Sequence, residues 1–148
     1  MTTEFPNSEN TLTSSTLALL ARISKATELF TTSGAKMNPG QLSESRVTLA
    51  SLYCSLGECV ASARKDSDIA EFESKKAKLS AYKTYRSLNS SGVDSKTYSE
   101  YDSLELTLEA IMKKYDYERL KNIHDGTSEM LNAMSSRLRV LEGEKRNS

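Results

Sequence analysis

Tryptophan is absent from this chain of 148 residues, which also has only three phenylalanines, two prolines and six glycines. So little proline and glycine argues against a turn-rich β fold. No apolar run approaches the length of a membrane span. With a mean hydropathy of -0.53, the chain can fold only if its apolar residues are confined to narrow helical stripes, as in hairpins and coiled coils. The composition therefore predicts an all-α fold.

An excess of either charge is also missing, since 20 Lys and Arg balance 20 Asp and Glu. This excludes a positive field over the whole protein, so polyanion binding would need local asymmetry or many copies side by side. The single histidine, His124, has no Cys, Asp or Glu placed with it at metal-ligand spacing. No nucleophile–base set and no phosphate-binding glycine motif can be assembled. We therefore expect a non-enzymatic protein with no cofactor and no metal.

Cysteine occurs twice, at Cys54 and Cys59. On one helix these side chains point about 140° apart, because each residue turns by about 100°, so they cannot pair with each other. Free thiols, together with the lack of a basic and then apolar leader at the amino terminus, predict a cytoplasmic protein.

The first part of the chain is predicted to hold a tail and a short helix. Residues 1–12 are polar and are expected to be disordered. Hydroxyl side chains at 13–15 offer an N-cap for a first helix over 13–32. The sequence Asn38-Pro39-Gly40 predicts a break, after which a second helix extends over 41–90.

The second helix is predicted to be continuous, because no proline or glycine lies between Glu58 and Ser91. Its apolar stripe changes phase once, which is typical of a stutter in a long helix. Gly92 suits a left-handed C-cap position at its end. The stripe comprises Leu42, Leu49, Leu52, Leu56, Cys59 and Ala63, and then Ile69, Phe72, Leu79 and Tyr82.

A third helix is predicted over 96–142, with 143–148 as a frayed tail. Ser95 or Thr97 can cap it, and Glu100 would complete a capping box with Thr97. Its stripe comprises Tyr101, Leu104, Leu108, Met112 and Tyr115, followed by Leu120, His124, Thr127, Leu131, Met134, Leu138 and Leu141.

The two long helices are each about 70 Å long, and their matched lengths and short polar connection predict an antiparallel hairpin within a single helical domain over 13–142. Two helices cannot bury both sides of their stripes, so we expect a homo-oligomer that associates through helical seams. The most regular seam predicts the oligomer interface: Leu120, His124, Leu131, Met134, Leu138 and Leu141.

A basic stretch before the turn is the candidate binding surface. It contains Lys75, Lys76, Lys78, Lys83 and Arg86, with Tyr82 and Tyr85 among them. One interpretation is a nucleic-acid site, in which the cations neutralise phosphates and a tyrosine stacks on unpaired bases. The other is an internal ion-pair ladder. A turn near residue 92 would place position 75 opposite about 109 and position 86 opposite about 98, where acidic residues are frequent.

Several stretches resemble the UvsY-like phage recombination mediators, which are small helical proteins. They are Leu49, Leu52 and Tyr53, the run Lys75-Lys76-Ala77-Lys78-Leu79-Ser80-Ala81 closing in Tyr85, the helix start Tyr98-Ser99-Glu100-Tyr101, and the segments Tyr117-Glu118-Arg119-Leu120-Lys121 and 130–138. Ser80 and Tyr82 stand where the family would have basic residues, so the DNA contacts would come from Lys76, Lys78 and Lys83. The resemblance implies oligomeric rings, single-stranded DNA binding, contact with a recombinase and a single-strand binding protein, and, for a phage protein, the host cytoplasm.

Two functions therefore remain open. The first is an oligomeric single-stranded DNA-binding accessory protein that helps load a recombinase during homologous recombination. The alternative is a helical structural, scaffolding or adaptor protein of a phage, without nucleic-acid contact, in which the basic stretch only neutralises the acidic one.

Overall fold

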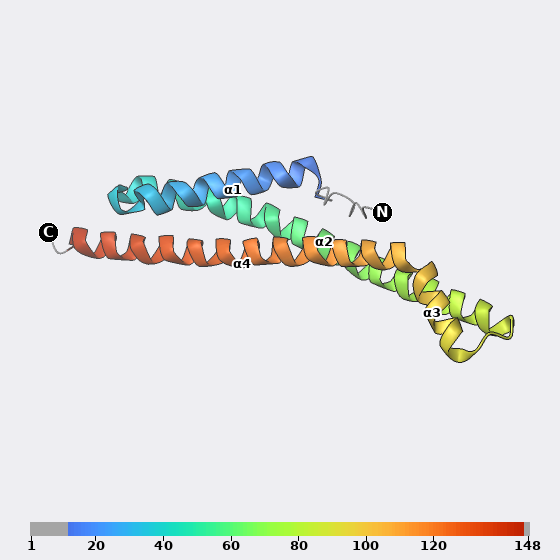
Figure 1. Ribbon diagram of the computed structural model, residues 1–148. Helices are drawn as coiled ribbons and strands as arrows, with labels where there is room; N and C mark the ends of the chain where they lie inside the picture. The colour runs from blue at the N-terminus through green and yellow to red at the C-terminus, as the bar shows by residue number, and fades with distance from the viewer. Residues whose placement is uncertain (1–11, 147–148) are drawn as a thin grey trace. The chain divides into compact units, whose positions relative to one another are not determined.

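A computed structural model describes residues 12–146, and within this range every long element is an α-helix (Figure 1). The elements are α1 (Ser14–Ser33), the 3-10 helix η1 (Gly34–Lys36), α2 (Pro39–Ser87), α3 (Gly92–Asp102) and α4 (Leu104–Arg146). The all-α prediction is confirmed. Of the two expected tails, 1–11 and 147–148 lie outside the described residues. None of the described helices is both long and apolar enough to cross a membrane.

The beginnings of α1 and α2 follow from their capping residues. Thr13 caps α1, as predicted, and its Oγ1 accepts a hydrogen bond from the Thr16 N–H at 3.2 Å. The predicted break at 38–40 is wrong. The Asn38 Oδ1 accepts from the Gln41 N–H at 2.9 Å, while the Gln41 Oε1 accepts from the Asn38 N–H at 3.1 Å, which is a reciprocal capping box. Pro39 then occupies the first helical position, where its missing N–H is no loss, so the helix begins before 41.

The turn after α2 is built differently from the prediction. Asn89, not Gly92, takes the left-handed conformation, with a φ of 63°. The Ser90 N–H bonds to the Tyr85 carbonyl and the Asn89 N–H to the Arg86 carbonyl, which is the Schellman arrangement. Gly92 is the first residue of α3, and the Ser91 side chain caps this helix by accepting from the Asp94 N–H. Ser95 and Thr97 therefore lie inside α3 instead of capping it.

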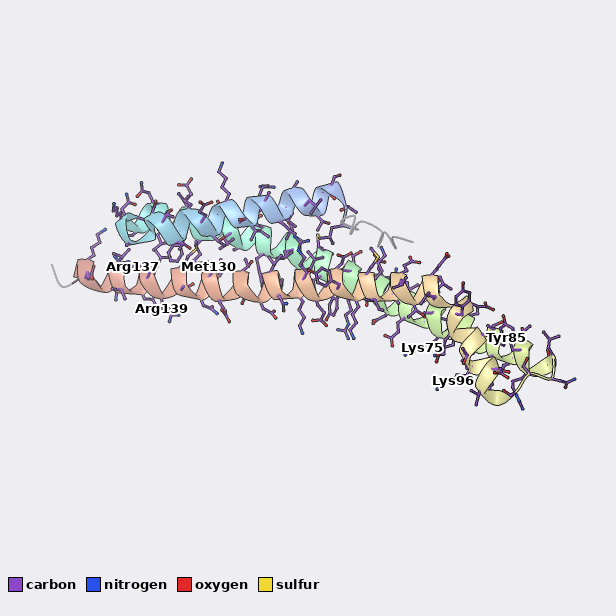
Figure 2. The ribbon with its side chains drawn as sticks, viewed as in Figure 1. Lys75, Tyr85, Lys96, Met130, Arg137 and Arg139 are labelled. Atoms are coloured by element: carbon purple, nitrogen blue, oxygen red, sulfur yellow. The ribbon has the colours of Figure 1, made fainter. Side chains whose placement is uncertain are left out.

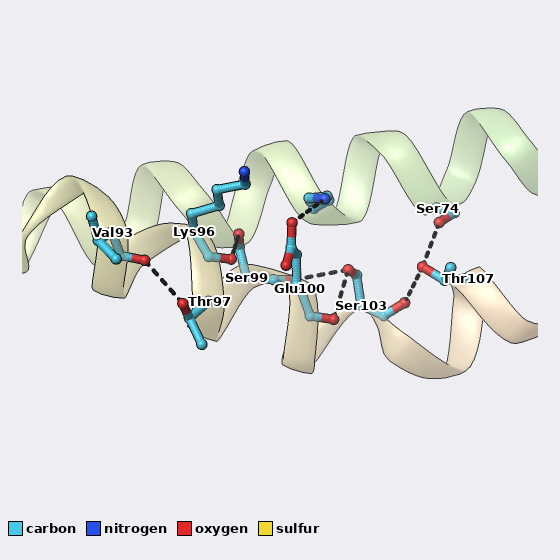
Figure 3. A network of polar contacts seen from close by, with 9 residues as sticks. Ser74, Val93, Lys96, Thr97, Ser99, Glu100, Ser103 and Thr107 are labelled. Atoms are coloured by element: carbon cyan, nitrogen blue, oxygen red, sulfur yellow. Dashed lines mark hydrogen bonds and ion pairs between the residues drawn. The ribbon is translucent and has the colours of Figure 1, made fainter.

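The predicted helix over 96–142 is interrupted at Ser103. The Ser103 hydroxyl donates to the Ser99 carbonyl at 2.8 Å and lies 3.3 Å from the Glu100 carbonyl, as Figure 3 shows. A serine that bonds back to the preceding turn competes with the helical ladder and bends it. At the other end, α4 continues through the expected frayed tail as far as Arg146. The single helix predicted for α2 is confirmed.

The chain divides into two compact units. Unit 1 comprises 1–60 and 119–148, and unit 2 comprises 61–118. The single domain expected over 13–142 stays a prediction beside this division, and we describe each unit by itself.

In unit 1, α1 packs with the first part of α2 and the last part of α4. These two parts are antiparallel, since Arg46 Nε donates to Ser135 Oγ at 2.7 Å and the rings of Tyr53 and His124 stack with centroids 4.2 Å apart. The core is aliphatic, as the apolar stripes predict. Its buried members are Ile23, Leu42, Leu49, Leu52, Leu56, Leu120 and Met134.

In unit 2, α3 and the first part of α4 run antiparallel to the second part of α2. The seam between them consists of small residues, and Ser67, Ala70, Ser95, Ser99 and Ser103 are buried in it. Ser74 and Thr107 share a hydrogen bond across this seam at 3.0 Å (Figure 3). The prediction of an aliphatic seam is wrong here. Large side chains placed in it by their spacing are exposed on the outside: Ile69, Phe72, Leu79, Tyr101, Leu104, Leu108, Met112 and Tyr115.

Candidate nucleic-acid interface

The basic stretch lies on the second part of α2, in unit 2, where Figure 2 labels Lys75 and Tyr85. Because successive residues turn by about 100°, its members cannot share one face. Lys78, Tyr82 and Tyr85 are half-buried on the side toward α3 and α4. Lys76 and Lys83 are exposed on the opposite side. The structure therefore does not bring the seven predicted residues together into one surface.

The inward side chains are bound to the facing helix. Lys78 Nζ forms an ion pair with Glu100 at 2.8 Å, drawn in Figure 3 as the contact from α2 to Glu100. The hydrogen bond from Lys78, and then its charge, lowers the pKa of the Glu100 carboxyl. The expected internal ladder is thus present at this rung, within about two turns' worth of the predicted pairing.

Tyr85 is also occupied within the unit. Its hydroxyl donates to Asp102 Oδ2 at 2.7 Å, and this hydrogen bond to a carboxylate raises the pKa of Tyr85. Its ring lies against Tyr98, with centroids 5.2 Å apart. A base could stack on Tyr85 only after these contacts were broken. Tyr82 is half-buried and likewise does not present an open ring face to solvent.

Two further cations are used locally. Lys75 pairs with Glu71 one turn earlier on α2, and the hydrogen bond and charge of Lys75 lower the pKa of Glu71. Arg86 Nη1 donates to the Ser90 carbonyl at 2.9 Å, just beyond the end of α2. Basic side chains are expected at a helix C-terminus, where they satisfy carbonyl groups and complement the dipole.

Lys76 and Lys83 form no hydrogen bond or ion pair with any other residue in the range 12–146. They are seven positions apart and so lie on one face of α2. Lys76 borders a shallow groove that also contains Lys65, Ile69 and Phe72. Lys65 was missed by sequence reasoning because it stands outside the dense basic run, although its distance of eleven residues from Lys76 is close to three helical turns.

The residues predicted for the oligomer interface lie together, but inside unit 1. Leu120 and Met134 are buried, and Leu131, Leu138 and Leu141 are half-buried. His124 stacks on Tyr53. The seam they form packs against helices of the same chain, so the buried members offer no surface to a second copy in this fold.

No arrangement for catalysis or metal binding stands out in the described part of the chain. Between residues 12 and 146 there is no cluster of three His, Cys, Asp or Glu side chains that could hold a metal ion. Cys54 and Cys59 are both free.

Comparison with protein-family models, curated protein sequences and solved structures found no match to this chain. The functional argument therefore rests on the geometry of the chain itself.

Proposed function

We propose that this chain is a non-enzymatic structural or adaptor protein that works by presenting apolar helix faces to a protein partner. One observation carries the proposal. Among the described residues, all but three of the large apolar side chains that are exposed lie in unit 2, the exceptions being Leu29, Val47 and Val140. Exposed apolar patches of this kind mark interaction surfaces.

The contacts of the basic stretch support the same proposal. Lys75, Lys78 and Arg86 already have partners within the chain. Both candidate stacking rings are at least half-covered. What remains for a polyanion is mainly Lys76 and Lys83, on a chain whose formal net charge is zero.

Fluorescence anisotropy of a labelled single-stranded oligonucleotide, measured at low and at moderate salt, tests this proposal. We expect no binding at either salt concentration by protein whose helicity and thermal unfolding show that it is folded. Binding that falls steeply as salt rises would overturn the proposal in favour of the second candidate.

The second candidate is a single-stranded DNA-binding accessory protein in recombination, with a recombinase and a single-strand binding protein as its partners. The unpaired, exposed pair Lys76 and Lys83 favours it, and so does the resemblance to UvsY-like mediators. Exposed ion pairs contribute only about 0–1 kcal/mol each, so Lys78 could exchange Glu100 for a phosphate.

For that candidate, Lys76→Ala with Lys83→Ala should weaken oligonucleotide binding and reduce the slope of log affinity against log salt by about 2, one unit per lost phosphate contact. The matched control is Lys25→Ala with Lys145→Ala, which removes the same charge from exposed positions of unit 1. Equal weakening by both pairs would show that the lysines on α2 form no particular site.

A further inference from the structure

Unit 2 carries two apolar stripes that its own helices leave uncovered. On α4 the stripe is Leu104, Leu108, Ile111 and Tyr115, with exposed fractions of 47–68%. Their spacings of four, three and four are those of a coiled-coil seam. They lie on the side of α4 turned away from the inner seam, because about 100° separates successive residues and the inner seam is already made by other positions.

The stripe on α2 has the same spacing but a different composition. Ile69, Phe72 and Leu79 are 45–67% exposed. Lys65, Lys76 and Lys83 complete the series, so that apolar and basic residues share one outward face at intervals of three and four. A face with this repeat fits a second helix, because coiled-coil knobs pack into holes formed by a facing helix.

The charges of the two stripes are complementary. The stripe on α4 continues into Glu118 and is bordered by Glu105, and both carboxylates are exposed and form no hydrogen bond or ion pair within the described residues. Lys114, the neighbouring cation, lies close enough to Glu71 to lower its pKa and so leans toward α2 of its own unit. Pairing two α2 stripes would oppose lysines, whereas pairing α2 with α4 opposes lysines and glutamates.

We propose that the α2 stripe of one copy of this chain docks on the α4 stripe of a second copy, in antiparallel orientation. This inference rests on the proposed function and names the partner. The inner seam sets Ser74 against Thr107 and Lys78 against Glu100. The same register on the outside places Ile69 opposite Ile111 and Phe72 opposite Leu108.

That register also accounts for the charges. It brings Lys76 beside Glu105 and Lys65 beside Glu118, so four side chains without a partner in the single chain gain one in the assembly. The contact is heterologous, since two different faces meet. Each copy therefore keeps one free stripe of each kind, and further copies add until the assembly closes on itself.

Two variants that each block one face test the proposal. Phe72→Glu with Leu79→Glu blocks the α2 stripe, and Leu108→Glu with Ile111→Glu blocks the α4 stripe. Multi-angle light scattering should give a mass above one chain for the unaltered protein and one chain for each variant alone. An equimolar mixture should give a dimer and nothing larger, because only one intact pair of faces remains.

The substituted side chains are exposed, so each variant should keep its helicity by circular dichroism and its thermal unfolding. Val47→Glu with Val140→Glu introduces the same charges at exposed apolar positions of unit 1 and should leave the mass unchanged. In a further test of register, Lys76→Glu should weaken the assembly and added Glu105→Lys should restore it.

The outcomes separate this inference from the proposed function. A monomeric unaltered protein overturns the inference, and so does a mixture that fails to dimerise. If the variant blocked on α2 still dimerises while the one blocked on α4 does not, two α4 stripes pair with each other and the inference is wrong. Salt-dependent oligonucleotide binding would overturn the proposed function, whatever the mass.

Discussion

Unit 1 and unit 2 are both built from helices with apolar residues at intervals of three and four, yet they use these residues in opposite ways. In unit 1 the aliphatic side chains of α1, α2 and α4 are buried, and His124 and Tyr53 complete the seam. In unit 2 serine and alanine are buried and the large apolar side chains are outside. An apolar stripe therefore indicates a helix and a contact, but does not say whether the contact is within the chain.

Truncation of equivalent leucines should break the resemblance between the units most clearly. Leu56 is fully buried in unit 1 and Leu108 is half-exposed in unit 2. We expect Leu56→Ala to lower the free energy of unfolding by about 2–5 kcal/mol, through lost burial and the cavity left behind. Leu108→Ala should lower it by less than about 1 kcal/mol when measured on the single chain by urea denaturation, as is usual for surface positions. Equal losses would mean that the stripe of unit 2 is buried within the chain after all.

Enlarging a small residue of the inner seam tests unit 2 from the other side. Ser99 is buried against α2, so Ser99→Leu should lower the free energy of unfolding by about 1–3 kcal/mol, because the helices must move apart. Thr97→Leu, two residues earlier on an exposed face of α3, is the matched control and should have little effect. If thermal unfolding tolerates both changes equally, the close seam is not what holds unit 2 together.

A smaller effect of opposite sign is expected at Ser95. Its side chain is fully buried and its Oγ has no hydrogen-bond partner. Because an unsatisfied buried hydroxyl is unfavourable, Ser95→Ala should raise the free energy of unfolding by about 1 kcal/mol. Ser99→Ala provides the comparison, since the Ser99 hydroxyl already donates to the Lys96 carbonyl at 2.8 Å (Figure 3). Destabilisation by Ser95→Ala would show that this hydroxyl has a partner.

The smallest expected effect concerns pH and distinguishes unit 2 by its ion pairs. The pKa of Glu71 and of Glu100 is lowered by Lys75 and Lys78 respectively. A lowered pKa in the folded state contributes stability above the ordinary carboxyl pKa, and this is lost as the pH falls through the folded value. Both groups are exposed, so the contribution is small and declines with salt.

Carboxyl NMR titration checks that effect directly. In Lys78→Met the Glu100 pKa should rise toward its ordinary range, while Glu71 titrates as before. Lys83→Met removes the same charge from the outer face of α2 and should move neither group. A Glu100 titration unaffected by Lys78→Met would contradict the ion pair across the seam.

Some features could be read from the residues alone because they are local. The stutter without proline or glycine predicts the continuous α2, and the hydroxyl groups before Leu17 predict the cap of α1. The turn shows the limit of such reasoning. Asn89 and Gly92 both tolerate the left-handed conformation, and only the hydrogen bonds that close α2 select Asn89.

The candidate site was less predictable than the helices. The basic run is evident in the sequence, but its division into Lys78 facing α3 and Lys76 facing away depends on the phase of α2 against its neighbour. Lys65 belongs to the outer face only because that phase places it there.

By itself the sequence determined that this protein is helical, where most of its long helical segments lie and that they return antiparallel, since propensity, capping and apolar period act within a few residues. Only the tertiary structure decided which face of each helix is inside. Small residues allow close approach of two helices and large ones fill wider seams, and both patterns were present on α2 and α4. In unit 2 the close approach of serine and alanine prevailed, and the larger side chains were left on the surface.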